Sequence, residues 1–332
     1  MELLRIFAMF LIMVLHADFA SLSAPSISEC QNFPISSFVR FFIEGLSIVA
    51  VNAFVILSGW YGIKPSTQKL CSFIFQVIFI MFLIYLVFFL IGKAPYYKLG
   101  SWVKIAFFQH YWFVQSYIIL YVFTPVLNSF VIISNEKSFR KVLFSLFLVQ
   151  VLFGLFPFAN TFGWFQTGYS PLTFFFLYLL ARYVRIYVPL IKMVSFYLWG
   201  WIICALLAAF IAMSFSLLGY GTDILLYVYG YTSPLTIIGA IMFVVAFSLM
   251  KFSRIWINWI AKSSFAVYIV HCHDCIFGPI YCSSIKLWYE TENVCMFLLK
   301  IGLLIVVIYT ISIIVDKIRI KIWEHILYVI RL

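Results

Sequence analysis

Long apolar runs, each about the length of a membrane crossing, constrain this chain more than any other feature. Residues 71–92 and 194–218 contain no Asp, Glu, Lys or Arg, and a helix needs about 20 apolar residues to cross about 30 Å of hydrocarbon. Only 10% of the 332 residues are charged, whereas a soluble domain is about one quarter charged. Soluble, disordered and fibrous classes are therefore excluded. A porin-like barrel is disfavoured because it needs short alternating segments.

The apolar pattern predicts an all-α polytopic bundle of about ten transmembrane helices. No sequence repeat is evident, and the short connections leave no room for a sizeable soluble domain, so we expect one membrane domain over residues 1–332. The expected helices cover roughly 3–22, 38–62, 71–92, 111–133, 142–160, 172–188, 194–218, 234–251, 263–282 and 296–315.

The distribution of Lys and Arg predicts the orientation of the bundle. With the N-terminus in the cytoplasm, 16 of the 22 Lys and Arg residues fall on the cytoplasmic side and 4 fall outside. Cytoplasmic loops are the ones enriched in Lys and Arg, so both termini are predicted to be cytoplasmic. The loop 93–104 disagrees, because it places Lys93, Lys98 and Lys104 outside. Residues 316–332 are predicted to form a basic amphipathic tail at the membrane surface.

The formal net charge of +11 needs no nucleic acid to explain it. Topology and contact with anionic lipid account for the basic residues, so the lipid bilayer is an expected partner and nucleic acid is not. The first helix begins at Met1 and has no usual cleavage site, so we expect no cleavable signal peptide. The short flank before Arg5 leaves open a start codon a few residues upstream.

Arg5 and His16 form the first candidate site. Ionisable groups inside spans are costly and usually functional, and His16 follows an apolar run in the first predicted helix. Eleven residues turn a helix by about 1,100°, about 20° past three turns, so both side chains lie on one face about 16 Å apart. Arg suits phosphate, and imidazole suits removal of a hydroxyl proton. An interfacial anchor and a hydrogen-bonded core histidine explain the pair equally well.

Three further clusters carry groups that could serve a site. Ser58 and Gly59 end an apolar run, Trp112 begins an aromatic stretch, and His271 ends the segment Val267–His271. Small residues commonly pack membrane helices, and aromatic residues commonly gather at the membrane interface. These ordinary explanations are preferred where the residues stand alone.

The seven cysteines suggest two other kinds of site. His271, Cys272, His273 and Cys275 mimic a zinc ligand set, but one helix presents too few of them to a common point. We therefore expect no metal and no permanently bound cofactor. Three further cysteines fall at the predicted outer face, where an oxidising periplasm would allow a disulfide. The sequence leaves any pairing open among Cys30, Cys282 and Cys295.

Together these segments resemble the acyltransferase-3 family of bacterial membrane proteins. The similar patterns are Arg–x10–His at Arg5–His16, a segment at 53–59 that resembles Phe-Phe-x-x-Ser-Gly with one residue more, a segment at 268–271 that resembles Tyr-Leu-x-His, and Trp112-Phe113 followed by Tyr121 and Pro125. The resemblance covers essentially the whole chain. Two departures are visible: Ala53 replaces a Phe, and Lys64 and Lys69 stand where the family has other basic residues.

The resemblance implies an O-acyltransferase in the bacterial inner membrane. Its donor substrate would be acyl-CoA, most often acetyl-CoA, and its acceptor a hydroxyl of a lipid-linked or nascent polysaccharide such as a capsular, O-antigen or exopolysaccharide unit. His16 would act as general base or carry the acyl group, with Arg5 beside it. The donor would be bound by Arg5, Ser58, Gly59, Lys64, Arg182 and Arg185. Asp18, Trp112 and His271 would lie near the acceptor.

Two alternatives compete with this hypothesis. A transporter or flippase of glycan-linked lipid would use the same polar groups as a path, but transporters often show internal repeats, and none is evident. A non-catalytic membrane partner of an assembly complex is the second alternative. In that case substitution of Arg5 or His16 would leave the surface glycan unchanged.

Overall fold

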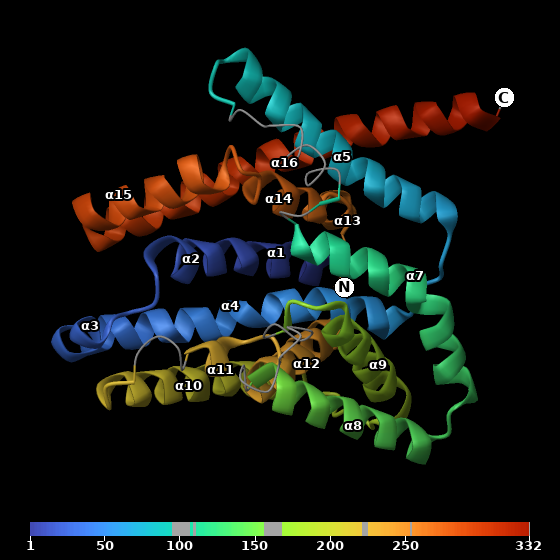
Figure 1. The fold of residues 1–332 in the computed structure, drawn as a ribbon, viewed down its shortest axis with the longest axis horizontal. Coiled ribbons are helices and arrows are strands. Elements are labelled where there is room, and N and C mark those ends of the chain that lie inside the picture. Colours follow the sequence, from blue (N-terminus) through green and yellow to red (C-terminus); the bar gives the residue numbers. More distant parts are fainter. Residues whose placement is uncertain (95–106, 109–110, 156–167, 221–224, 253, 332) are drawn as a thin grey trace. The chain divides into compact units, whose positions relative to one another are not determined.

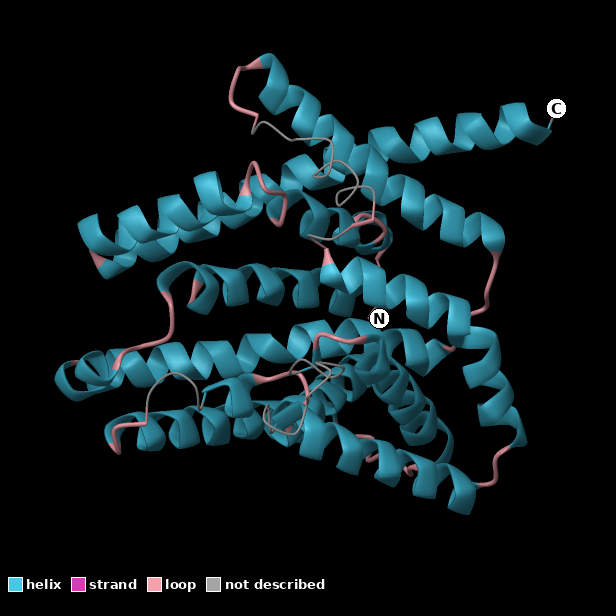
Figure 2. Cartoon of the chain, viewed as in Figure 1, coloured by secondary structure: helices cyan, strands magenta, loops and turns pink. Residues whose placement is uncertain are grey.

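The computed structural model describes residues 1–94, 107–108, 111–155, 168–220, 225–252 and 254–331. Within these ranges every regular element is helical and no strand occurs (Figure 2). The helices are α1 (Glu2–Ala17), α2 (Phe19–Leu22), α3 (Ile27–Asn32), α4 (Pro34–Tyr61), α5 (Thr67–Leu90), α7 (Trp112–Ile133), α8 (Glu136–Leu155), α9 (Pro171–Tyr187), α10 (Val194–Leu217), α11 (Leu225–Tyr229), α12 (Pro234–Leu249), α13 (Ile255–Ala261), α14 (Ser264–His271), the π-helix η4 (Phe277–Cys282), α15 (Ser283–Thr291) and α16 (Val294–Arg331).

Seven helical segments in the described part are long and apolar enough to cross a membrane. They are Glu2–Leu22, Pro34–Tyr61, Thr67–Leu90, Trp112–Ile133, Val194–Leu217, Leu225–Leu249 and Val294–Ile330. The chain is thus an all-helical, multi-pass membrane protein, as the sequence predicts. The count of about ten spans and the cytoplasmic placement of both termini stay predictions. Of the loop that disagrees with the orientation, Lys98 and Lys104 lie outside the described residues.

One expected helix, 263–282, is interrupted in the structure, and that prediction is wrong. Helix α14 ends at His271 and a turn follows before η4 begins at Phe277. Pro279 lies inside η4 and has no backbone N–H to donate, which disfavours a regular α-helix there. The amide of Tyr281 donates to the carbonyl of Ile276 at 2.8 Å, the five-residue spacing of a π-helix. Such turns are rare and frequently lie at functional sites.

The residues of the predicted basic tail, 316–332, continue the preceding helix, because α16 runs without interruption from Val294 to Arg331. Part of the predicted basic tail is buried. Asp316 and Arg319 are 0% and 6% exposed, and the Arg319 guanidinium donates to Asp316 at 2.6 Å. Gln76 of α5 donates to the same carboxylate oxygen at 2.8 Å. Arg319 therefore pairs inside the protein and is not part of a polar face.

The chain falls into two compact units that interleave in sequence, one made of residues 1, 23–65 and 112–252, and the other of residues 2–22, 66–111 and 253–332. The expectation of one domain over 1–332 stays a prediction. The first unit is organised around α4, which packs against α9, α10 and α12 (Figure 1). Small residues allow such close packing. A Cβ on Gly59 would lie only 2.5 Å from the carbonyl oxygen of Tyr178.

The second unit holds α1 against α13 and α14, while α14 also packs on α5 and α16. Tyr309 of α16 donates to the carbonyl of Ile6 at 3.2 Å and lies 3.3 Å from the Ser264 hydroxyl, which ties three helices together. The π-helix contributes a further link, because the buried Tyr281 hydroxyl donates to the carbonyl of Met13 at 2.5 Å. The late part of α1 is therefore fixed against the segment that follows α14.

Candidate active site

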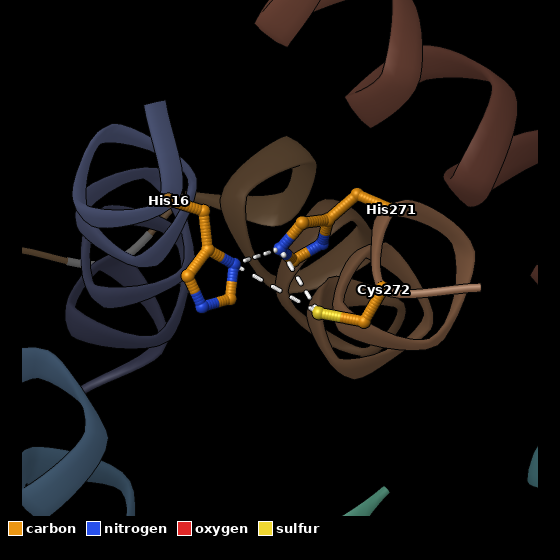
Figure 3. A group of neighbouring side chains, drawn as sticks. All are labelled: His16, His271 and Cys272. Atoms are coloured by element: carbon orange, nitrogen blue, oxygen red, sulfur yellow. Dashed lines mark hydrogen bonds between the residues drawn. The ribbon is translucent and has the colours of Figure 1, made fainter. Parts of the chain in front are cut away.

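Two histidines from α1 and α14 meet inside the second unit. Nδ1 of His16 lies 2.9 Å from Nε2 of His271 (Figure 3). The other ring nitrogen of His271, Nδ1, lies 2.6 Å from the backbone carbonyl oxygen of Val267. A carbonyl oxygen only accepts hydrogen bonds, so Nδ1 of His271 carries the proton and donates to it. In a neutral imidazole the other nitrogen is then the acceptor.

This network assigns the protonation of His16. Because Nε2 of His271 accepts, Nδ1 of His16 must donate the shared hydrogen bond, and Nε2 of His16 keeps its lone pair. That second nitrogen is turned away from His271 (Figure 3). The pair thus presents one basic nitrogen with a fixed orientation, which is what general base or nucleophilic catalysis by histidine requires.

Aromatic side chains from the segment after α14 enclose the histidine pair. The ring of Phe277 meets His16 edge-on with centroids 5.4 Å apart, and the ring of Tyr281 lies 5.9 Å from that of His271. A third ring comes from outside that segment: the buried Tyr111, which directly precedes α7, donates to the carbonyl of Ile269 on α14 at 2.9 Å. His271 is 0% exposed. The interrupted segment is therefore what allows rings to close over the pair, which one straight helix would not permit.

Cys272 completes a three-residue cluster with the two histidines. Its Sγ lies 3.4 Å from Nε2 of His271 and 3.8 Å from Nδ1 of His16 (Figure 3). The sequence predicts His271 near the acceptor, but it does not predict that His271 or Cys272 contacts His16. These residues are 255 and 256 positions away from His16. The shared motif Tyr268–His271 was the only signal in the sequence for this meeting.

Arg5 and Asp18 belong to the same unit as His16. Arg5 forms an ion pair with Glu2 at 3.0 Å, and its side chain is 43% exposed. Asp18 is buried where α1 ends, and its backbone carbonyl accepts from the amides of Ser21 and Leu22. Arg5 lies on the helix that carries His16, and Asp18 directly follows that helix. Their expected roles toward the donor phosphate and the acceptor stay predictions.

Ser58 and Gly59 lie in the first unit, where they make packing contacts. The Ser58 hydroxyl donates to the carbonyl of Phe54 at 3.0 Å and lies 3.2 Å from the Tyr117 hydroxyl. Gly59 allows the backbone of α9 at Tyr178 to approach α4. These contacts agree with the helix-packing explanation of the motif. Donor binding by the pair stays a prediction.

Three of the predicted phosphate ligands gather at the end of α4. The guanidinium of Arg185 donates to the carbonyl of Trp60 and lies 5.0 Å from the centre of the Tyr61 ring. Nε of Arg182 is buried and has no hydrogen-bond partner among the described residues. Lys64 follows on the exposed connection to α5. Cations grouped around a loop can bind phosphate oxygens, and guanidinium does so with two parallel hydrogen bonds.

The turn that carries Lys64 is fixed by a second small network. The Tyr178 hydroxyl accepts from the amide of Ile63 at 3.0 Å and donates to Oδ1 of Asn128 at 2.7 Å. The amide nitrogen of Asn128 donates to the carbonyl of Ile63 at 3.0 Å. Sequence reasoning missed Tyr178 and Asn128, because nothing in their local sequence marks them as partners of this turn.

Trp112 lies in an aromatic cluster of the first unit. Its ring centre is 4.4 Å from that of Tyr169 and 5.5 Å from that of Tyr231, on which it stacks. Phe113 and Phe174 extend the cluster. These contacts give Trp112 a packing role in the first unit, and its expected role toward the acceptor stays a prediction.

All seven cysteines are free thiols, so Cys30, Cys282 and Cys295 form no disulfide.

Comparison with known proteins identifies a family that the chain resembles over most of its length. The model of the acyltransferase-3 family, described as an acyltransferase domain, matches residues 1–316. The match includes both histidines, Cys272 and the cations at the end of α4. No curated protein and no solved structure matches the chain.

Proposed function

The chain belongs to the acyltransferase-3 family, and we propose that this multi-pass membrane acyltransferase moves an acetyl or other acyl group from coenzyme A to a hydroxyl of a cell-envelope glycan. The observation that carries the proposal is the oriented pair of His16 and His271, 2.9 Å apart. The proposed location is the bacterial inner membrane, and the proposed acceptor is a lipid-linked or nascent polysaccharide. Acyl-CoA is a substrate here and not a resident cofactor.

In the proposed reaction His16 acts as the general base. Its Nε2 removes the proton of the acceptor hydroxyl while that oxygen attacks the thioester carbonyl. The carbon–oxygen bond forms, the carbon–sulfur bond breaks, and the proton passes from Nε2 to the departing thiolate of coenzyme A. His271 acts as a positioning residue, because its Nε2 holds the Nδ1 proton of His16 in place throughout.

The same free nitrogen would serve a two-step alternative, in which Nε2 attacks the thioester and carries the acyl group. The two routes differ when the acceptor is left out. A carrier releases one equivalent of free coenzyme A per protein in a burst, whereas a general base releases none until the hydroxyl arrives. Rapid measurement of free thiol after mixing with acetyl-CoA alone separates them.

Donor binding requires cations for the phosphates of coenzyme A. In the first unit we propose Arg182 and Lys64 as phosphate ligands. Nε of Arg182 has no hydrogen-bond partner in the part of the chain that the structure describes, and Lys64 is exposed. Arg185 contributes charge while it stacks on Tyr61. In the second unit we propose Arg5, which would exchange its ion pair with Glu2 for a phosphate oxygen.

The decisive experiment uses the purified full-length protein, radiolabelled acetyl-CoA and the glycan of the native host. We expect transfer of label to the glycan by the wild type and a loss of about 100-fold or more in His16→Ala. His325→Ala is the matched control, because His325 is an exposed histidine on α16. Full transfer by His16→Ala would show that the proposed site is wrong.

A further inference from the structure

The cluster of His16, His271 and Cys272 has a geometry that its role in proton transfer does not need. The cluster offers three potential ligand atoms, namely one ring nitrogen from each histidine and the sulfur of the cysteine. All three atoms lie within 4.8 Å of one another. Figure 3 shows the three atoms directed toward one point between α1 and the end of α14. The sequence predicts no metal because one segment alone supplies too few ligands, whereas these three ligands come from two segments.

The separations are close to those of a tetrahedral metal site. Zinc–nitrogen bonds of about 2.05 Å and zinc–sulfur bonds of about 2.3 Å place two nitrogens about 3.3 Å apart, and a nitrogen and a sulfur about 3.6 Å apart. In the structure the nitrogens are 2.9 Å apart and the sulfur lies at 3.4 and 3.8 Å from them. A small opening of the pair would fit the ion. Three protein ligands with one open position is the usual arrangement at catalytic-type zinc sites.

The protonation of His271 also suits metal binding. His271 donates Nδ1–H to the Val267 carbonyl, which leaves Nε2 as a lone pair facing the cluster. Metal-binding histidines almost always make such a hydrogen bond with their other nitrogen, because it fixes the ring and its tautomer. Cys272 would release its thiol proton to solvent on binding, as thiolate ligands do.

We propose that His16, His271 and Cys272 form a binding site for a thiophilic divalent ion such as Zn²⁺, and that the bound ion switches off His16 as a base. To bind the metal ion, Nδ1 of His16 gives up its proton and uses the lone pair that is left. The neutral ring keeps one proton, which moves to Nε2. The nitrogen that would accept the proton of the acceptor hydroxyl is then already protonated. The proposal of metal binding is based on the geometry of the three residues, whereas the proposal that the metal inhibits His16 rests on the proposed function.

Metal binding is tested directly with Co²⁺ as the probe, on full-length protein in detergent. We expect one Co²⁺ per chain, with a thiolate-to-metal absorption band that Zn²⁺ displaces. Cys272→Ser and Cys272→Ala should both lose the band. Cys275→Ser is the matched control and should keep it, because Cys275 is a buried cysteine of the same segment outside the cluster. A missing band in the wild type, or an unchanged band in both Cys272 variants, would overturn the site.

Inhibition is measured separately, as the acetyl-transfer rate of each variant with saturating Zn²⁺ divided by its own metal-free rate. Loss of a general base predicts a fall of about 100-fold or more in the wild type and in Cys275→Ser, and a much smaller fall in the Cys272 variants. An unchanged rate in wild type that has bound one ion would overturn the switching. If no variant transfers acetyl groups without metal, the proposed function fails, and the cobalt titration still decides the site.

Discussion

Replacement of His271 by Phe tests whether this residue positions His16 or merely fills space. His271 is 0% exposed and its Nε2 is the acceptor at 2.9 Å for Nδ1 of His16. Phe keeps most of the ring volume and removes that acceptor. A buried donor left without a partner costs about 1–3 kcal/mol. This cost falls on the tautomer with the proton on Nδ1, which is the one that leaves Nε2 free.

The expected result follows from that cost. A loss of about 1–3 kcal/mol from the active tautomer corresponds to a fall in kcat of about 5- to 150-fold, since each 1.36 kcal/mol is tenfold. The KM for acyl-CoA should change little, because His271 has no proposed contact with the donor. The assay is steady-state transfer of labelled acetyl groups by purified protein, at acceptor saturation.

A rescue variant separates positioning from packing. His271→Gln places an amide oxygen where Nε2 stood, so it restores an acceptor for Nδ1 of His16 and should recover a large part of the lost kcat. His325→Gln on exposed α16 serves as the control, and the thermal unfolding of every variant is measured alongside. Full kcat in His271→Phe, or equal losses in the Phe and Gln variants, would refute the positioning argument.

Three further predictions concern the rest of the molecule. Gly59→Ala should lower the free energy of unfolding by about 1–3 kcal/mol through overpacking, seen as a lower Tm in detergent, because its Cβ would lie 2.5 Å from the Tyr178 carbonyl. Asp316→Asn should lower it by about 3–5 kcal/mol, since the buried Arg319 then loses its countercharge; chemical unfolding measures this. Arg182→Gln should raise the KM for acyl-CoA about tenfold while kcat stays near wild type, because one charged hydrogen bond is worth about 1.5–3 kcal/mol; a kcat loss without a KM change would contradict donor binding.

Matched controls exist for each of the three. Gly302→Ala adds a methyl group on α16 where nothing lies within 4 Å, so the Tm should not fall. Glu324→Gln changes an exposed acid on the same helix as the buried ion pair. Arg140→Gln removes an exposed cation from α8, and the KM for acyl-CoA should stay at the wild-type value. If a control variant changed as much as its test variant, the effect could not be attributed to the contacts of the residue under test.

The sequence predicts the helical membrane fold and the importance of His16 because both are local properties. An apolar run of about 20 residues is readable without any partner, and a lone imidazole inside such a run is conspicuous. The interruption of 263–282 is harder to predict, because the apolar composition of this segment favours one continuous helix in spite of Pro279. The π-turn follows from backbone groups that must be satisfied around that proline.

Partners distant along the chain could not be read from the pattern. Helical periodicity places His16 and Arg5 on one face of α1, but it says nothing about which residue of another helix meets that face. The contact with His271 spans 255 positions. Arg319 is a second example, because its charge and its place near the end of the chain predict only the side of the membrane on which it lies. Its burial depends on Asp316 and on Gln76 of α5, which only packing brings together.

The choice of orienting group for His16 follows from the cost of charge in an apolar interior. In many histidine sites a carboxylate holds the ring, but an ionised carboxylate buried away from water costs several kcal/mol unless it is paired. Here the carbonyl of Val267 orients His271, and His271 orients His16, so the resting network holds no formal charge. A positive charge arises only when Nε2 of His16 takes a proton during the proposed reaction. On a regular helix, Asp18 would be rotated about 200° around the helix axis from His16. The acidic residue nearest in sequence is therefore not the group that orients His16, and that role falls to His271.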